Sequence, residues 1–318
     1  MAHVSIEELP VFVYPGRRRV NYNPSHIMQT SLRYLCTLWL AFFNCVATMS
    51  EAQQPSARKA QFRAATYNIR YDADADKQSG NGWNVRKGPL SDVIRNHQFD
   101  VVGTQEGDAN QLADLKGLLP GFDYVSHPYG GKGDLHNCAT FYRTAMFEVL
   151  DSGVFWFSET PDEPSIGWDA TDRRICNWTK FKVKETGREF YFFNVHFYWQ
   201  LEVARRESGP LLVEKIKEIA GKVPAICVGD FNSTVETYQI KTIKTLLHDV
   251  YDRSETPRQG VENTNLGGGV FQGEPKNRID YIFLTPHFEV KDYQVISDVY
   301  NENRYPSDHL PVTSSLAF

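Results

Sequence analysis

Apolar residues from about residue 62 onward form short runs of strand length, and several of these runs end on an acid, an amide or a histidine. Ala225 to Val228 has the length and composition of a buried strand, and Gly229, Asp230 and Asn232 follow it. Asp230 and Asn232 are two residues apart, so they project on the same side of an extended chain. Taken alone, this segment is also what an ordinary turn after a strand looks like.

Four other apolar runs carry a polar side chain at or near their end. Three of them lead to Asn68, Glu106 and His196, and the fourth, residues 279–283, contains Asp280. Near the C-terminus, residues 307–309 (Ser-Asp-His) precede another apolar run. A buried acid is costly unless it is paired or binds a cation. Because ligands of open α/β folds bind beyond the strand ends, the pattern predicts one crevice where these groups converge.

Predicted strands outnumber predicted helices. Helices are expected at about 86–97, at 109–118 and at 203–220, where Pro210 predicts a kink or a later start. Several strands adjoin in sequence, which favours mixed sheets packed face to face with helices outside over a purely parallel sheet. The predicted strands are 62–69, 99–105, 138–143, 147–157, 175–184, 189–197, 224–229, 279–284 and 289–297.

Long polar segments between these elements predict a rim around the strand ends. They span residues 71–85, 158–173 and 261–278, and Trp83 and Trp168 lie in the first two. A tryptophan in a loop can stack on a base or a sugar, although such residues pack locally at least as often.

Length and charge restrict the classes of function. The chain has 318 residues, of which 41% are hydrophobic, enough for a large core and one domain of about 250 residues. Residues 61–318 hold 28 Lys and Arg against 36 Asp and Glu, a net charge of -8. Charge alone therefore argues against a basic nucleic-acid binder, although bound divalent cations would locally reverse the sign.

The first 60 residues have the composition of a leader. Residues 28–52 contain a mildly basic start, a mostly apolar stretch and small residues at Ser50 and Ala52, as in a secretion signal. Residues 53–60 follow as a linker, and one domain spans 61–318. We expect a secreted or periplasmic protein with no integral membrane domain after cleavage. The alternative is a disordered tail with one membrane-seeking helix.

Cysteine use does not indicate a disulfide scaffold. Cys138, Cys176 and Cys227 remain after the leader, an odd number, and each lies in or beside an apolar run. We expect buried small residues at these positions.

Six short motifs occur in order along the chain. They are Thr66-Tyr67-Asn68, Thr104-Gln105-Glu106, Asn194-Val195-His196, Gly229-Asp230-Phe231-Asn232, Arg278-Ile279-Asp280-Tyr281-Ile282 and Ser307-Asp308-His309. Together they resemble the endonuclease/exonuclease/phosphatase superfamily, the deoxyribonuclease I-like proteins, over about residues 61–318. Three further motifs, around Arg86, Arg143 and Trp168, are similar to a secreted bacterial branch of that superfamily. The resemblance implies a four-layer α/β (α+β) sandwich of two packed mixed β-sheets flanked by helices.

The implied chemistry is metal-assisted hydrolysis of phosphate esters. Glu106 would bind Mg²⁺ or Mn²⁺ directly, with Asn68 and Asp308 nearby. A hard cation held by carboxylates neutralises the charge of a phosphate ester, which is the physical reason for such a site.

The same resemblance assigns the catalytic side chains. Asp230 would orient or deprotonate the attacking water, and Asn232 would hold that water or a phosphate oxygen. His309, paired to Asp280, would act on the phosphate, because a histidine beside a buried acid has a raised pKa and can donate to a developing oxyanion. His196 would donate a hydrogen bond to the phosphate or assist the leaving group.

Substrate contacts are expected from Arg86, Trp168, Arg278 and His136. His136 is included because branches of the family place a Glu six residues before the arginine of Phe-Tyr-Arg, where this chain has Asn137 beside His136.

A second departure follows His196. Related secreted proteins tend to continue with Phe-Asp-His, whereas this chain has Phe197-Tyr198-Trp199. Two aromatic residues there would suit a ring or an acyl surface.

Three classes of function remain open at this point. The first is a secreted, divalent-metal-dependent phosphodiesterase or phosphatase, with a nucleic acid, sugar phosphate, inositol phosphate or phospholipid headgroup as substrate and no stable protein partner. The second is a catalytically silent protein that binds a phosphorylated or glycan ligand. The third is a glycosidase that uses Glu106 and Asp230, although it leaves His309 without a role.

Overall fold

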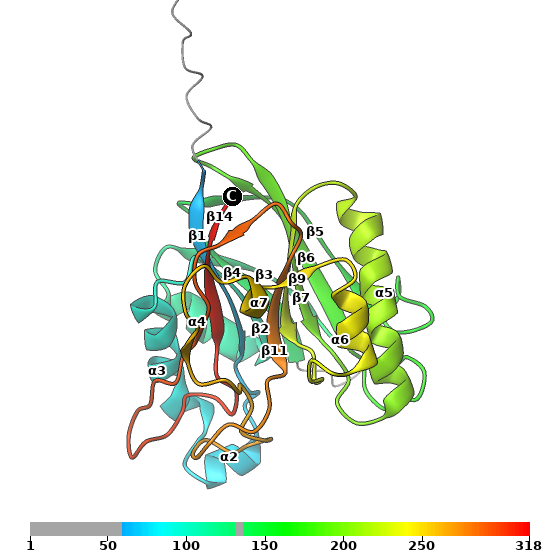
Figure 1. Cartoon of the computed structure of the whole chain (residues 1–318). Coiled ribbons are helices and arrows are strands. Elements are labelled where there is room, and N and C mark those ends of the chain that lie inside the picture. Colours follow the sequence, from blue (N-terminus) through cyan, green and yellow to red (C-terminus); the bar gives the residue numbers. More distant parts are fainter. Residues whose placement is uncertain (1–58, 131–135) are drawn as a thin grey trace, which may run out of the picture. The chain divides into compact units, whose positions relative to one another are not determined.

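Two mixed β-sheets pack face to face and helices cover their outer surfaces, as the sequence predicts (Figure 1). The computed structural model describes residues 59–130 and 136–318. The expected signal at residues 28–52 lies outside the described residues, so the leader stays a prediction.

The first sheet contains eight strands within the described residues, and it is mixed because β1 runs parallel to β2 but antiparallel to β14. Its order is β10 (Gln259–Gly260), β13 (Gln294–Val295), β14 (Val312–Ala317), β1 (Gln61–Asn68), β2 (Val101–Asp108), β4 (His136–Arg143) and β3 (Phe122–Pro128), with β12 (Glu289–Val290) paired to β14.

The second sheet has six strands in the same part of the chain. β7 and β8 are parallel, and β11 is antiparallel to β8. The order is β5 (Phe147–Trp156), β6 (Ile175–Val183), β7 (Glu189–His196), β8 (Ala225–Asp230), β11 (Asp280–Leu284) and β9 (His248–Asp249).

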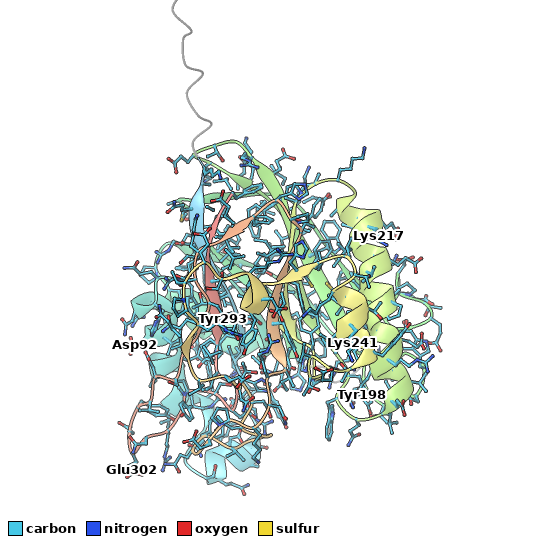
Figure 2. The ribbon with its side chains drawn as sticks, in the orientation of Figure 1. Asp92, Tyr198, Lys217, Lys241, Tyr293 and Glu302 are labelled. Atoms are coloured by element: carbon cyan, nitrogen blue, oxygen red, sulfur yellow. The ribbon has the colours of Figure 1, made fainter. Side chains whose placement is uncertain are left out.

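Helices lie on both outer faces of this sandwich. α3 (Trp83–Asn96) and α4 (Ala109–Leu118) cover the first sheet, and α5 (Glu202–Ala220) and α6 (Tyr238–Ile243) cover the second. Two short helices, α2 (Asp74–Gln78) and α7 (Val250–Arg253), lie in the connections. Figure 2 shows Lys217 and Lys241 on α5 and α6, and both residues are exposed to solvent.

Strand alternation explains why the central runs are apolar throughout. On β8, Ile226 and Val228 belong to the core between the sheets, whereas Ala225 and Cys227 pack beneath the helices. Both faces of a central strand are therefore buried, which produces a continuous apolar run rather than an alternating one.

Several observed elements differ from the predicted ones. The sequence pattern missed the strands β3, β9, β10 and β14 and the helices α6 and α7, and α2 forms inside the segment expected to be a polar loop. α5 runs through Pro210 without a break. Beside that proline, a Cβ on Gly209 would lie 2.6 Å from the Cα of Gln239, so close packing against α6 holds this part of the helix.

Cys138, Cys176 and Cys227 are buried and free, as expected. Among the helices of the two described segments, none is both long and apolar enough to cross a bilayer.

Candidate active site

Four of the predicted site residues come from strand ends that the two sheets bring together. Asn68 ends β1, His196 ends β7, Asp230 ends β8 and Asp280 begins β11. In the register, Asp230 is opposite His196 on one side and Asp280 on the other. Alternation along each strand points these side chains into the space between the sheets, at the end of the central core.

Glu106 reaches the same place because β2 is irregular. The register of β2 against β4 shifts between Thr104 and Gly107, and Glu106 has a φ of 65°. A bulge re-aims a side chain, and a non-glycine residue at positive φ persists only where its surroundings fix it. The Asn68 amide fixes it here, donating over 3.1 Å to Glu106 and over 3.1 Å to Asp230.

Asp308 lies on the wall of the same crevice. Its Oδ2 accepts a 2.7 Å hydrogen bond from the Gly269 backbone N–H, and the Arg70 guanidinium is 3.8 Å away. Arg70 also donates to Asp76 over 2.9 Å. Burial raises the pKa of Asp308, and the nearby Glu106 charge adds to this effect.

His309 and Asp280 form a buried pair. The Nδ1 of His309 is 2.9 Å from Asp280 Oδ2, which also accepts a 2.6 Å hydrogen bond from the Thr264 hydroxyl. Burial disfavours the imidazolium, but the carboxylates of Asp280 and Asp230 outweigh it and raise the pKa of His309 well above its usual value. These carboxylates favour the imidazolium form of His309, whose Nε2 lies 2.9 Å from the Asn265 side-chain amide and 3.7 Å from Asp230.

His196 has the opposite charge state. Burial, with the nearby Arg174 guanidinium, lowers the pKa of His196 well below its usual value. Its Nδ1 is 2.5 Å from the Tyr129 hydroxyl, and burial raises the pKa of that hydroxyl, so Tyr129 donates. The ring proton is then on Nε2, 3.5 Å from Asp230.

The donor set fits a hard divalent cation. Glu106, His196 and Asp230 each offer an atom within 4.8 Å of the others; with the Nδ1 of His196 bonded to Tyr129 and a proton on Nε2, the two carboxylates are the groups of this set that can ligate a metal. Burial raises the pKa of Asp230 to about 7, and the neighbouring Asp280 and Glu106 charges contribute, so the buried cluster carries an excess of negative charge that a cation would offset. Metal ligation by Glu106, Asn68 and Asp308 stays a prediction; Glu106 and Asp308 line one cavity, and the Asn68 amide is bonded to Glu106.

A second group, formed by Asp230, Asp280 and His309, also has metal-ligand spacing. The Nδ1 of His309 is bonded to Asp280 in it, and the raised pKa of His309 favours its protonated form, so we interpret this group as an acid–histidine pair.

The cluster opens into a cavity of about 460 Å³, and the Asn232 side chain also reaches it. Asn232 has a φ of 45°; its N–H donates to Asp230 over 2.9 Å and its amide donates to the Phe197 carbonyl over 3.0 Å. The residues around the cavity are Arg70, Tyr71, Glu106, Tyr129, His136, Arg174, His196, Trp199, Asp230, Asn232, Asn265, Gly267, Gly268, Ile279, Asp308 and His309.

A larger cavity of about 1050 Å³ adjoins the first and shares four lining residues with it, Tyr71, Tyr129, His136 and Arg174. Its other polar walls carry four carboxylates and two further cations. These are Asp72, Asp74, Asp108, Asp172, Lys77 and Arg173.

Of the four residues predicted to contact the substrate, only His136 lines the catalytic cavity. His136 lines both cavities, with Nδ1 3.0 Å from Asp108 and its ring against Tyr71. Trp168 lines neither of these two cavities and packs under the second helical layer, so a ligand contact by Trp168 finds no support in its position.

Arg278 also faces away from the crevice. Both terminal nitrogens donate to Asp249 over 2.9 Å, and the guanidinium lies over the rings of Tyr251 and Tyr281. It borders a separate cavity of about 210 Å³. Arg278 precedes β11, so strand alternation does not set its direction; its pair with Asp249, on the neighbouring β9, holds the side chain there.

The position of Arg86 corrects its predicted role. Its side chain is fully buried, and its Nε, Nη1 and Nη2 atoms make five hydrogen bonds to main-chain carbonyls, so no donor remains for a ligand. Arg86 holds together the segments that frame the site. The acceptors belong to Ile69, Arg70, Tyr71, Asn81 and Pro306.

Sequence reasoning missed several residues of the cavity. Tyr129, Arg174, Arg70 and Asn265 lie outside the motifs, and no spacing rule places them near the strand ends. Of the three aromatic residues after His196, two are buried, and only Trp199, 54% exposed, is available to a ligand.

Known proteins are similar to this chain over most of its described length. The model of the Endonuclease/Exonuclease/phosphatase family matches residues 65–309. A solved endonuclease/exonuclease/phosphatase family protein from Bacteroides thetaiotaomicron is 40% identical, with a TM-score of 0.77 over 82% of this chain and 99% of that chain. A mannosyl-6-phosphatase from Bacteroides thetaiotaomicron VPI-5482 is 40% identical, with a TM-score of 0.76 over 81% of this chain and 100% of that chain.

Among curated proteins, Drosophila melanogaster nocturnin is 24% identical over 71% of this chain and 41% of its own length. The match to the exoribonuclease subunit Ccr4 of Debaryomyces hansenii covers 35% of that protein. The chain thus spans well under half the length of these two relatives.

Proposed function

Because the chain belongs to the endonuclease/exonuclease/phosphatase family, whose members hydrolyse phosphate esters, we propose that it is a divalent-metal-dependent phosphate ester hydrolase. One observation carries the proposal: Glu106, Asp230, His196 and the His309–Asp280 pair converge in one cavity. Mg²⁺ or Mn²⁺, held at Glu106 with Asn68 and Asp308 beside it, would supply charge neutralisation for the phosphate.

The charge states of the side chains suit the remaining steps. Asp230, with a pKa of about 7, can take a proton from water at neutral pH. The His309 cation and the neutral His196, with its proton on Nε2, are two donors for phosphate oxygens. The Asn232 amide oxygen can accept a hydrogen bond from the attacking water, because its N–H₂ group is engaged by Phe197.

For the substrate class, we propose a phosphorylated sugar. The mannosyl-6-phosphatase at 40% identity supports this choice, and so does the larger cavity, because it can receive a leaving group. Its walls include Asp72, Asp74, Asp108 and Asp172. Carboxylates and amides are suitable partners for sugar hydroxyls.

We further propose secretion or periplasmic export, which rests on the leader at residues 28–52. Expression of the full chain in a bacterial host and N-terminal sequencing of the exported product test it. A mature start near residue 53 is expected, and an intact leader on a protein retained in the cytoplasm would contradict it.

The catalytic proposal is tested with the purified chain on mannose 6-phosphate, p-nitrophenyl phosphate and bis(p-nitrophenyl) phosphate, in Mg²⁺, in Mn²⁺ and in EDTA. Turnover is expected with metal and not in EDTA. Asp230→Asn and His309→Ala should each lower kcat by at least about 100-fold, the usual scale for a general base or a transition-state donor. Circular dichroism checks that both variants fold.

His287→Ala is the matched control, because His287 is exposed and lies outside both cavities. Phosphate binding without turnover would instead support the catalytically silent binding protein. Full turnover of Asp230→Asn would remove that residue from the mechanism, and turnover in EDTA would contradict metal dependence.

A further inference from the structure

Arg174 is a cation in the catalytic cavity that the family motifs do not include. It directly precedes β6, whose pairing of Cys176 with Val195 on β7 puts Arg174 near the strand end that carries His196. It lines the catalytic cavity and the larger one. Its guanidinium lies over the rings of Tyr129 and Tyr198, 5.6 Å and 5.8 Å from the ring centres, and Figure 2 labels Tyr198 near the start of α5.

Within the described residues, Arg174 has no carboxylate partner. In this part of the chain its side chain makes one hydrogen bond, from Nη1 to the Arg173 carbonyl at 3.3 Å, and its buried Nε has no acceptor. A buried guanidinium N–H without an acceptor is costly, and such groups in native proteins call for an explanation. The rings hold the guanidinium plane, yet most of its five donors remain available to a ligand.

The other cations of the catalytic cavity are already matched by acids. Arg70 is bonded to Asp76 at 2.9 Å and lies 3.8 Å from Asp308, and His309 is bonded to Asp280. Arg174 is therefore positive charge that a substrate can use, on the side of the cavity that continues into the larger one.

Charge distinguishes the two types of phosphate ester. A monoester at neutral pH carries two negative charges on three non-bridging oxygens, whereas a diester carries one charge on two. Arginine binds such oxygens in a planar, bidentate arrangement. A free guanidinium beside the metal-ligand cluster therefore favours the monoester, whose additional charge it can match.

We propose that Arg174 binds the non-bridging oxygens of a phosphomonoester and makes this protein a phosphomonoesterase, an inference that rests on the proposed hydrolase function. In the reaction, a water oxygen bonds to phosphorus, the phosphorus–oxygen ester bond breaks, and the leaving alcohol takes a proton. The products are an alcohol and inorganic phosphate. Inorganic phosphate keeps the dianionic character that Arg174 recognises, so it serves as a binding probe.

The test compares Arg174→Gln with the wild type on p-nitrophenyl phosphate and bis(p-nitrophenyl) phosphate. Loss of a charged hydrogen-bond donor should lower kcat/KM for the monoester by about 10- to 100-fold and for the diester by less than about 3-fold. Inhibition by inorganic phosphate should weaken by a similar factor. Arg174→Lys keeps the charge without the planar fork, so it should recover part of the monoester rate.

Arg205→Gln is the matched control. Arg205 is also half-buried with an unpartnered Nε, but it lies on α5 and lines neither cavity. Both activities of this variant should stay within about 2-fold of the wild type, the scale of a surface substitution.

An equal loss of both activities in Arg174→Gln would overturn the inference and leave Arg174 with a purely structural role. If the wild type hydrolyses neither of these esters nor mannose 6-phosphate, the proposed function fails, and phosphate binding decides this inference separately. Inorganic phosphate should raise the Tm of the wild type and not that of Arg174→Gln; an equal rise in both would contradict a phosphate-binding role. Arg174→Lys repeats the comparison if the glutamine variant does not fold.

Discussion

Asp230 lies close to charges of both signs, and its protonation is determined by them. Its Oδ2 is 3.5 Å from His196 and 3.7 Å from His309, and its Oδ1 accepts from the Asn232 N–H. The same carboxyl on an exposed turn would be ionised above about pH 4. Its chemistry is therefore a property of the assembled site rather than of the Gly-Asp-Phe-Asn segment.

A pH dependence of stability follows for the metal-free protein. A pKa raised to about 7 in the folded state means that the folded form binds this proton more tightly than the unfolded form. Asp230 stabilises the fold at low pH, and this contribution is lost as the pH rises from about 4 to 7. His309, also raised, acts with the same sign, and Glu106, whose pKa is lowered, acts with the opposite sign.

Urea denaturation of wild type and Asp230→Asn in EDTA, at pH values from 4 to 8, isolates the contribution of Asp230. The variant should lose less stability than the wild type between pH 4 and 7, because its neutral amide cannot ionise. Parallel curves for the two proteins would show that Asp230 has an ordinary pKa.

Arg86 supports a second prediction at this scale. Arg86→Lys keeps the charge but cannot make five hydrogen bonds, so buried carbonyls lose their donors and the free energy of unfolding should fall by about 3 kcal/mol or more. KM should change little if the fold is retained. Arg95→Lys, at an exposed ion pair, should change stability by less than about 0.5 kcal/mol. Unchanged stability with a raised KM would restore the substrate role for Arg86.

At the scale of elements, β2 both positions Glu106 and sets the distance between the two sheets. Its bulge presents Glu106 to the site, and before the bulge Gly103 allows the second sheet to approach. Two residues after Gly103, the Gln105 amide donates over 2.7 Å to Asn194 Oδ1 on β7, a buried hydrogen bond between the sheets. β2 thus fixes both the spacing of the layers and the position of Glu106.

Gly103→Ala tests the spacing. A Cβ at this position would lie 2.6 Å from Val228 Cγ2 and 2.8 Å from the Asn194 side chain, so the sheets must separate locally. The expected loss of stability is about 1–3 kcal/mol, measured by denaturation.

Gly117→Ala, on the exposed side of α4, is the control for that comparison. A Cβ at Gly117 meets nothing within 4 Å, and replacing a helical glycine should raise stability by about 0.5–1 kcal/mol. Equal effects of the two substitutions would show that the sheets tolerate more space than the packing indicates.

At the scale of the whole molecule, strands from distant parts of the sequence form two sheets, and both sheets place acidic side chains at one end of the core between them. Residues 61–318 already carry a net charge of -8, and the site concentrates part of it in the interior. A divalent cation that binds only the folded state stabilises it by mass action, by about 2.7 kcal/mol at 100 times its Kd.

Titration with MgCl₂ or MnCl₂ should therefore raise the Tm, and EDTA should reverse the rise. Glu106→Gln should remove most of the shift, whereas Glu274→Gln, an exposed acid outside both cavities, should retain it. A shift of equal size in Glu106→Gln would exclude Glu106 as a principal ligand.

The amino-acid sequence by itself determined the sandwich of mixed sheets and the residues at the strand ends, because alternation and run length are local properties of the chain. It placed Asn68, Glu106, His196, Asp230, Asp280, Asp308 and His309 together, and the structure gathers them in one crevice. The tertiary structure alone decided the inward burial of Arg86, the turning of Arg278 toward Asp249, and the entry of Arg174 and Tyr129 into the cavity. These positions depend on contacts between segments distant in sequence, so only the packing of the two sheets and their loops determines them.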